Sequence, residues 1–345
     1  MHMPVFALAE SAQGVVFVGG ASEVFVFGRD GSYIRSLGRQ GDGPGEFAFV
    51  STLGLHGDTL WVGDPAVGRL TRFRPDGSVL ETISPRPPGG LTLNPLFLAP
   101  DRSVVTAEPE RMGAGLTGDP AGNRRIIWNR WQPNGPSAHA FVVAGVTRES
   151  MIIRGDGQAV RSVRQPFHDR TPIAFSGALP YALVGSHTRT GGDGTIFVER
   201  VHFDGTRDTA LAVPYRAQRI TGAIVDSVIH QLGRELSWRP GADEPPADPS
   251  PDIAGQLRAA LYAPEYRPAL WDLVQGNDGS IWVGRERSAS GHVRWLVASE
   301  SEGARAYIYL PVHQRPMSVT HTHVWISEPT DLDIGRVIKY RIDFP

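Results

Sequence analysis

The sequence contains no cysteine, a single lysine and no long apolar run. The absence of cysteine excludes disulfides, thiolate metal sites and a cysteine nucleophile. No stretch of about 18 apolar residues suggests a membrane span, and the first residues lack the basic and apolar regions of a secretory signal. A formal net charge of −2, without long runs of like charge, argues against nucleic acids and membrane surfaces. We therefore expect a monomer with a small-molecule ligand or substrate.

Glycine and proline are frequent instead, with 40 and 28 residues in a chain of 345. They are spread along the chain, which is typical of a polypeptide that turns about every ten residues. A chain of this length could form two domains, but an all-β architecture can hold it in one. Because Lys339 is the one lysine among 34 basic residues, an individual arginine carries less functional information here.

One complete repeat unit lies between Leu37 and Ser84. It opens with a glycine-rich loop from Gly38 to Phe47. Four short strands with tight turns between them follow this loop: Val50 to Leu55, Thr59 to Asp64, Arg69 to Arg74 and Ser78 to Ser84. Such a unit predicts one small antiparallel sheet.

The second strand of this unit recurs six times. The six copies are Val15 to Val18, Leu60 to Val62, Val104 to Thr106, Tyr181 to Val184, Ile281 to Val283 and Val324 to Ile326. A single four-stranded sheet cannot bury both its faces, but six sheets stacked radially can. We predict one all-β domain over 1–345, a six-bladed β-propeller. Trp61, Trp282 and Trp325 are expected at equivalent buried positions between its blades.

The run Gly43-Pro44-Gly45-Glu46-Phe47, followed by an apolar strand, Leu60 to Asp64 and the turn Pro75-Asp76-Gly77, resembles the bacterial NHL-like six-bladed β-propeller proteins. The resemblance identifies architecture better than chemistry, because related propellers include scaffolds, ligand receptors, calcium-dependent lactonases and lyases. It implies an extra N-terminal strand that completes the last blade. It also implies a periplasmic or secreted protein if a leader precedes Met1. A three-stranded sixth blade is the alternative.

A helical insertion is predicted between blades four and five, from Arg216 to Pro268. Ile224, Val228 and Leu232 recur at helical spacing, and Ser250-Pro251 begins a second helix. We expect this insertion to lie on the functional face. There it would act as a partial lid or as a static buttress.

The loops between blades, together with those between second and third strands, should emerge on one face, which we call the long-loop face. It receives Gly38 to Phe47, Arg111 to Asn123, Ala144 to Asp169, Ser186 to Gly194 and the helical insertion. The opposite face has only tight turns. The sequence therefore predicts a small-molecule site at the channel mouth on the long-loop face.

The candidate site residues follow the second strands or precede the innermost strands, so they should point toward this mouth. The candidates for acid/base catalysis are Glu108, His168, Asp169, His187 and Glu328. The candidates for ligand binding are Asp64, Asn94, Arg170, Arg267, Trp271, Arg285, His313 and Arg315. For Asp64 a structural role is the alternative, with its carboxylate accepting from loop amides.

The resemblance implies calcium as a candidate cofactor, because calcium-dependent six-bladed lactonases hold the cation in the channel with oxygen ligands from different blades. Asp64, Asn94, Glu108 and Glu328 offer such oxygen atoms. No contiguous calcium loop exists, so no metal ligand is assigned. The function that follows is a small-molecule site that could hydrolyse esters or lactones. The alternative is a non-catalytic propeller that binds a ligand or a protein.

Overall fold

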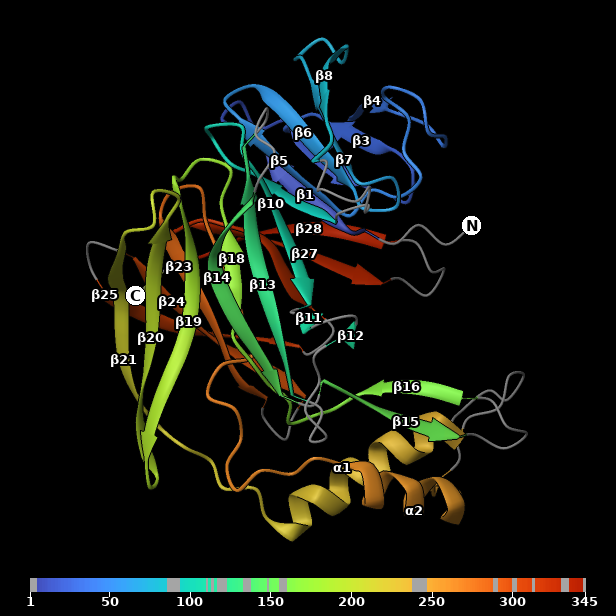
Figure 1. Cartoon of the computed structure of the whole chain (residues 1–345), viewed down its shortest axis with the longest axis vertical. Coiled ribbons are helices and arrows are strands. Elements are labelled where there is room, and N and C mark those ends of the chain that lie inside the picture. The colour runs from blue at the N-terminus through green and yellow to red at the C-terminus, as the bar shows by residue number, and fades with distance from the viewer. Residues whose placement is uncertain are drawn as a thin grey trace.

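The computed structural model describes residues 5–85, 94–109, 111–112, 115–116, 123–132, 138–147, 149–154, 160–237, 247–287, 291–299, 303–311, 314–329 and 335–343. Within them six antiparallel sheets follow one another along the chain (Figure 1). The first strand of every sheet lines one central cavity, so these strands are innermost. The predicted all-β six-bladed propeller is thus confirmed.

The first three blades each start with a short inner strand. Blade one comprises β1 (Ala7–Glu10), β2 (Val16–Gly19), β3 (Val24–Phe27) and β4 (Tyr33–Leu37). Blade two comprises β5 (Thr52–His56), β6 (Thr59–Asp64), β7 (Arg69–Phe73) and β8 (Val79–Ile83). Blade three has a fifth strand at its outer edge and comprises β9 (Pro95–Leu98), β10 (Val104–Pro109), β13 (Asn123–Trp131), β14 (Ala138–Thr147) and β17 (Asp169–Arg170).

The last three blades contain the longest strands. Blade four comprises β18 (Ile173–Phe175), β19 (Tyr181–Thr190), β20 (Asp193–His202) and β21 (Arg207–Arg216). Blade five comprises β22 (Asp272–Gln275), β23 (Ser280–Arg287), β24 (His292–Ser299) and β25 (Gly303–Pro311). In the described residues blade six has three strands, β26 (Arg315–Val319), β27 (His323–Pro329) and β28 (Gly335–Arg341).

Two hairpins and two helices complete the described elements. The hairpins pair β11 (Arg111–Met112) with β12 (Gly115–Leu116), and β15 (Ser150–Arg154) with β16 (Val160–Arg164). The helices α1 (Gly222–Ser237) and α2 (Pro251–Ala260) follow β21 and precede β22 in the chain. Neither helix is long and apolar enough to cross a membrane.

Three segments expected to be loops contain strands instead. The segment 111–123 contains β11 and β12. Residues 186–194 extend β19 and β20, which pair as far as Thr190 and Asp193. The segment 144–169 contains β15, β16 and β17. In β15 the buried Met151 and Ile153 alternate with exposed residues, which is the strand period, and they are buried by contacts with α1 and α2, which are distant in sequence.

The turns between third and fourth strands repeat one local chemistry. Asp30, Asp76 and Asp204 each precede a glycine with positive φ, between 81° and 92°. The carboxylate of each aspartate accepts a hydrogen bond from the amide two residues later, at 3.0, 2.8 and 2.9 Å. Glycine is favoured here because a Cβ is disfavoured at positive φ.

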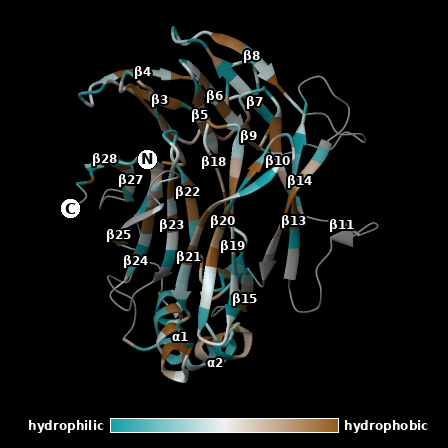
Figure 2. Ribbon diagram, turned by 90° about the vertical axis from the view of Figure 1, so that its left-hand side faces the viewer, coloured by the Kyte–Doolittle hydropathy of each residue, from teal (hydrophilic) through white to brown (hydrophobic). Residues whose placement is uncertain are grey.

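Apolar clusters join each blade to the next. Figure 2 shows hydrophobic residues, in brown, in the strands of the blades. Blades one and two, two and three, three and four, four and five, and five and six each share a cluster of buried side chains. Leu8, Val16 and Val18 of blade one, with Met317 and Val337 of blade six, form the sixth cluster. The ring is therefore closed by packing at all six junctions.

The helices α1 and α2 lie together at one end of the molecule, beside β15 and β16 (Figure 1). Met151 and Ile153 of β15 pack against Ile229 of α1 and against Ile253 and Leu257 of α2. The apolar stripes of the helices are thus buried against each other and against a hairpin that leaves blade three.

Trp61 and Trp282 lie at equivalent positions in the second strands of their blades. Both are in the core, 3% and 0% exposed. Trp325 is only half-buried. Its indole Nε1 donates to Glu10 Oε2 of blade one at 2.7 Å, and Lys339 Nζ donates to Glu10 Oε1 at 2.7 Å. The lysine also lies over the Trp325 ring, 5.4 Å from its centroid. Glu10 thus connects the last blade to the first.

We expect Glu10→Ala to lower the free energy of unfolding by about 1 to 3 kcal/mol, because it removes two hydrogen bonds at the ring junction, one of them to a charged donor. Asp343→Ala is the matched control, because its exposed pair with Arg341 joins no blades. Urea melts at pH 7 compare the two. Equal losses would contradict a closing role for Glu10.

Candidate functional site

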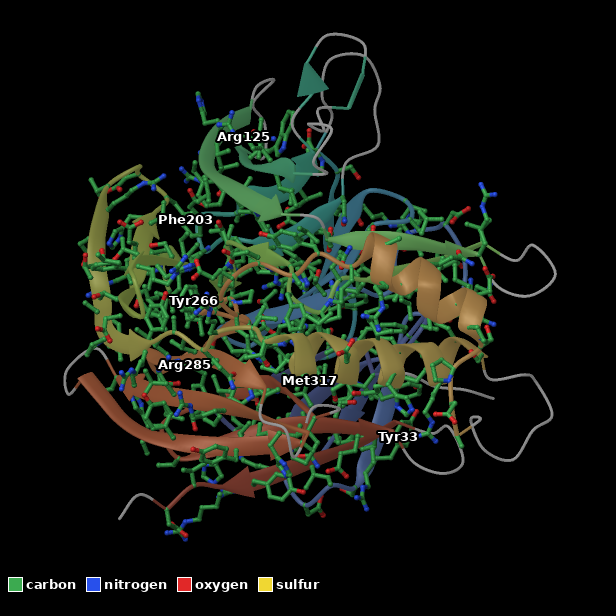
Figure 3. The ribbon with its side chains drawn as sticks, turned by 90° about the horizontal axis from the view of Figure 1, so that it is seen from below. Tyr33, Arg125, Phe203, Tyr266, Arg285 and Met317 are labelled. Atoms are coloured by element: carbon green, nitrogen blue, oxygen red, sulfur yellow. The ribbon has the colours of Figure 1, made fainter. Side chains whose placement is uncertain are left out.

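A cavity of about 370 Å³ lies at the centre of the propeller, between the first strands of all six blades. Arg315, the first residue of β26, lies on its wall at the long-loop face. Seen from below, Met317 of the cavity wall lies nearer the middle than Arg285 (Figure 3). Concave spaces of this kind are where propellers and other folds bind small ligands.

A carboxylate joins two arginines beside this cavity. Asp272 begins β22 and is 5% exposed. Its Oδ2 accepts from Arg315 Nε at 2.8 Å, and its Oδ1 accepts from the Leu273 amide at 3.0 Å. Arg170 Nη2 of β17 lies 3.4 Å from the same Oδ1. Three blades therefore meet at one buried carboxylate.

The charge at this point is unbalanced. Burial lowers the pKa of Arg170, and the Asp272 carboxylate opposes that shift. Arginine nevertheless stays protonated at neutral pH, because its ordinary pKa is so high. Two guanidinium groups thus share one carboxylate beside the cavity, which leaves a net positive charge of one for this trio.

A second polar group lies on the other side of β17. Asp169 Oδ2 is 3.9 Å from His187 Nε2 of β19. The Tyr215 ring of β21 packs edge-on against His187 at 6.2 Å, and Arg285 of β23 lies 5.5 Å from the Tyr215 centroid. Arg285 Nη1 also reaches the Tyr307 hydroxyl at 3.4 Å.

Burial raises the pKa of two side chains in this second group, Asp169 and Tyr215. Burial raises the pKa of Asp169, and a protonated His187 opposes the shift. Burial likewise raises the pKa of Tyr215, against the effect of Arg189 and Arg285. A carboxyl and an imidazole whose environments differ can act as an acid and base pair.

His168 has a structural position. Its side chain is 4% exposed, and Nδ1 donates to the Gln165 carbonyl at 2.6 Å. Its ring packs edge-on against Trp271 at 5.6 Å, and Trp271 also joins the apolar cluster between blades five and six. Arg267 lies 5.8 Å from the Phe167 ring centroid, so these residues brace the segment before β17.

Asp64 has a structural role, which was the alternative prediction: its carboxylate accepts hydrogen bonds from backbone amides. The carboxylate is fully buried and accepts from the amides of Ala48 at 2.8 Å and Ala66 at 3.0 Å. These bonds fasten the glycine-rich loop between blades one and two to the end of β6.

The remaining carboxylate candidates lie on other blades. Glu108 accepts from the Thr106 hydroxyl at 2.9 Å. Glu328 accepts from Arg336 at 2.7 Å and from Gln314. Asn94 is exposed. In the described part of the chain, no hydrogen bond or ion pair joins these residues to Asp169 or His187.

No group of three or more histidine, aspartate or glutamate side chains among the described residues could hold a metal ion. His313 lies outside those residues. Calcium therefore stays a prediction from the sequence.

Asp272 and Tyr215 were missed by the sequence analysis. For Asp272 a signal exists, since it is the only acidic residue that begins an inner strand, while Arg315 is the only basic one. For Tyr215 no signal exists, because an aromatic residue in an outer strand is ordinary.

Comparison with known proteins supports the fold. Residues 12–75, from β2 to β7, match a family model described as a 6-bladed beta-propeller. No curated protein matches the chain.

Several solved structures align with low similarity. A DUF4221 family member from Bacteroides vulgatus has a TM-score of 0.42 at 8% identity, over 99% of this chain and 94% of that chain. A chain of the mitotic checkpoint complex has a TM-score of 0.42 at 12% identity, over 99% and 90%. A Bacteroides fragilis protein provisionally assigned as a 6-phosphogluconolactonase has a TM-score of 0.35 at 13% identity, over 99% and 85%. Such similarity indicates neither a ligand nor a reaction.

Acidification should lower the stability of the fold through two histidines, His168 and His56. Burial lowers the pKa of His168 below its ordinary value of 6.5, and burial does the same for His56. Both contribute stability above that ordinary value, and this stability is lost as the pH falls toward the folded-state pKa. We expect His168→Gln to flatten the fall in melting temperature between pH 7 and pH 5. His56→Gln should do the same, and parallel curves for wild type and variants would contradict this account.

Proposed function

We propose that this propeller binds a small organic anion at the mouth of its channel, with the Arg315 guanidinium as the main contact. The observation that carries the proposal is the double role of Arg315. It pairs with the buried Asp272, and it also lines the central cavity.

Among the described residues, the pairing leaves Arg315 with free N–H donors for a ligand. Its Nε binds Asp272, while its terminal amino groups carry further N–H donors in a planar fork. The side chain is 68% exposed, whereas that of Asp272 is 7% exposed. A planar guanidinium fixed at one end is well suited to a carboxylate or a phosphate.

The surroundings favour an anion as well. Arg170 shares the Asp272 carboxylate, so a second guanidinium lies beside Arg315 at the mouth. Positive charge along a concave mouth attracts anionic ligands.

Hydrolysis of a small ester or lactone is the second candidate, and the Asp169–His187 pair favours it. The pair has the residue types and the raised aspartate pKa that acid/base catalysis uses. Asp169 and Arg170 are consecutive on β17, so their side chains point to opposite sides of the strand. The Asp169–His187 pair therefore lies apart from the Asp272–Arg315 pair, and only Arg315 lines the cavity. Anion binding at Arg315 is for this reason the better supported function.

The helical segment 216–268 borders this mouth in our proposal. Its two ends pair, since the Arg267 amide donates to the Gln218 carbonyl at 2.9 Å. Gln256 of α2 exchanges two hydrogen bonds with the backbone of Arg154 in β15, each 2.9 Å long. Helices and hairpin would therefore move as one unit in gating the mouth.

Replacing Arg315 tests anion binding directly. We expect Arg315→Gln to weaken binding of small carboxylates by about 10- to 100-fold, because a charge-assisted hydrogen bond is lost. Arg341→Gln is the control, since Arg341 is an exposed arginine of the same blade that pairs with Asp343. Titration calorimetry over a panel of carboxylates and phosphates measures both. Binding that tolerates Arg315→Gln as well as Arg341→Gln would refute the proposal.

Turnover of aryl esters and lactones tests the second candidate, with calcium and with EDTA in parallel. If Asp169 and His187 are catalytic, Asp169→Asn and His187→Gln should each lower kcat by about 100-fold or more. Asp208→Asn is the matched control, because Asp208 pairs with His202 elsewhere on blade four. Absence of turnover, or equal turnover in all variants, would exclude this chemistry.

A further inference from the structure

We infer that the channel takes the ring of an aromatic carboxylate, whose carboxylate meets Arg315. This inference rests on the proposed function and names the ligand class for the same mouth. It follows from aromatic residues that line the same cavity as Arg315, and from the unpaired buried carboxamide of Gln275, a residue of the same wall.

The aromatic wall comes from blades two, three and four. The Trp61 ring meets the Phe97 ring edge-on at 5.5 Å, and Phe97 stacks on Phe175 at 4.8 Å. All three residues line the cavity. Aromatic rings favour flat partners that stack or meet them edge to face.

A glycine brings the tryptophan to the cavity. Gly54 of β5 pairs with Trp61 of β6 across the two strands. A Cβ at Gly54 would lie 2.6 Å from Trp61 Cζ2 and 2.9 Å from its Nε1. The indole therefore lies directly on the inner strand, where any larger residue would displace it.

Gln275 lines the same cavity from blade five. Its side chain is 7% exposed, and neither Nε2 nor Oε1 has a hydrogen-bond partner among the described residues. Trp61 Nε1 and Thr52 Oγ1 also lack partners there. Buried polar groups are nearly always paired, with protein, water or ligand.

Gln165 shows the usual state of a buried glutamine in this protein. It is 2% exposed, its Nε2 donates to the Ala260 carbonyl at 2.8 Å, and its Oε1 accepts from the Tyr262 amide at 3.0 Å. The two glutamines thus differ in pairing rather than in burial. Gln275 is the one whose carboxamide calls for a partner.

Size and charge complete the ligand class. A cavity of about 370 Å³ is at the small end for ligand sites, so one or two rings fit. The positive mouth at Arg315 selects an anionic end. A ring hydroxyl or ring N–H would pair with the Gln275 carboxamide, which both donates and accepts.

Titration calorimetry on the full chain tests this class with three probes. These are 4-hydroxyphenylacetate, the aliphatic anion hexanoate and the neutral 4-hydroxyphenylacetamide. We expect 4-hydroxyphenylacetate to bind at least about tenfold more tightly than either of the others, because only it satisfies both the wall and Arg315.

Two leucine variants separate recognition from structure. Gln275→Leu should weaken 4-hydroxyphenylacetate about tenfold and leave hexanoate unchanged, while raising or preserving the melting temperature, because it removes an unpaired amide. Gln165→Leu should lower the melting temperature without changing either affinity. Trp61→Phe keeps an aromatic ring at this position and removes the indole N–H, so it changes the aromatic wall less than a leucine substitution would.

The outcomes separate this inference from the proposed function. If hexanoate binds as tightly as 4-hydroxyphenylacetate and depends on Arg315, anion binding stands and the aromatic inference falls. If no anion binds, the proposed function falls, and the inference with it. If Gln275→Leu changes the melting temperature but not the affinity for 4-hydroxyphenylacetate, the carboxamide binds only water and the inference is overturned.

Discussion

The junction between blades six and one is the constraint on which the rest of the structure depends. Five junctions follow from chain order, but the sixth must join residues more than 300 positions apart. Glu10 accepts from Trp325 and Lys339 there, beside an apolar cluster. Because the cavity is walled by the first strands of all six blades, it exists only when this junction is closed.

Closure also explains where the charges gather. The long-loop face places the starts of the inner strands side by side, so Asp272 and Arg315, from neighbouring blades, meet at hydrogen-bond distance. Asp272 is buried and must be paired, and two guanidinium groups overcompensate it. The excess charge lies at the cavity wall, while the opposite side of the cavity is aromatic. The channel therefore combines a guanidinium on its wall with aromatic residues of blades two to four.

Much of the fold was predictable from the sequence, because its signals are local. Asp-Gly turns and apolar second strands need only a few residues to be recognised, and they indicate six blades. The hairpin of β15 and β16 was missed because its apolar residues bury against α1 and α2, which are distant in sequence. The half-burial of Trp325 was also missed, since it depends on the junction with Glu10.

The candidate site was predictable only in outline. Arg170, Arg315, Asp169 and His187 were recognised because they adjoin strand ends on one face. Asp169 and Arg170 belong to different groups because they are consecutive on β17, and this short strand was not predicted from the sequence. Gln275 was missed for a related reason: a lone glutamine in an apolar strand is informative only when its partners, or their lack, are known.

The central claim is that Arg315 and the channel together recognise an aromatic carboxylate. A crystal structure of the protein soaked with 4-hydroxyphenylacetate tests it most directly. The account predicts the carboxylate within hydrogen-bond distance of the Arg315 guanidinium, and the ring between Phe97 and Gln275. A ring bound outside the channel, or a carboxylate away from Arg315, would contradict it.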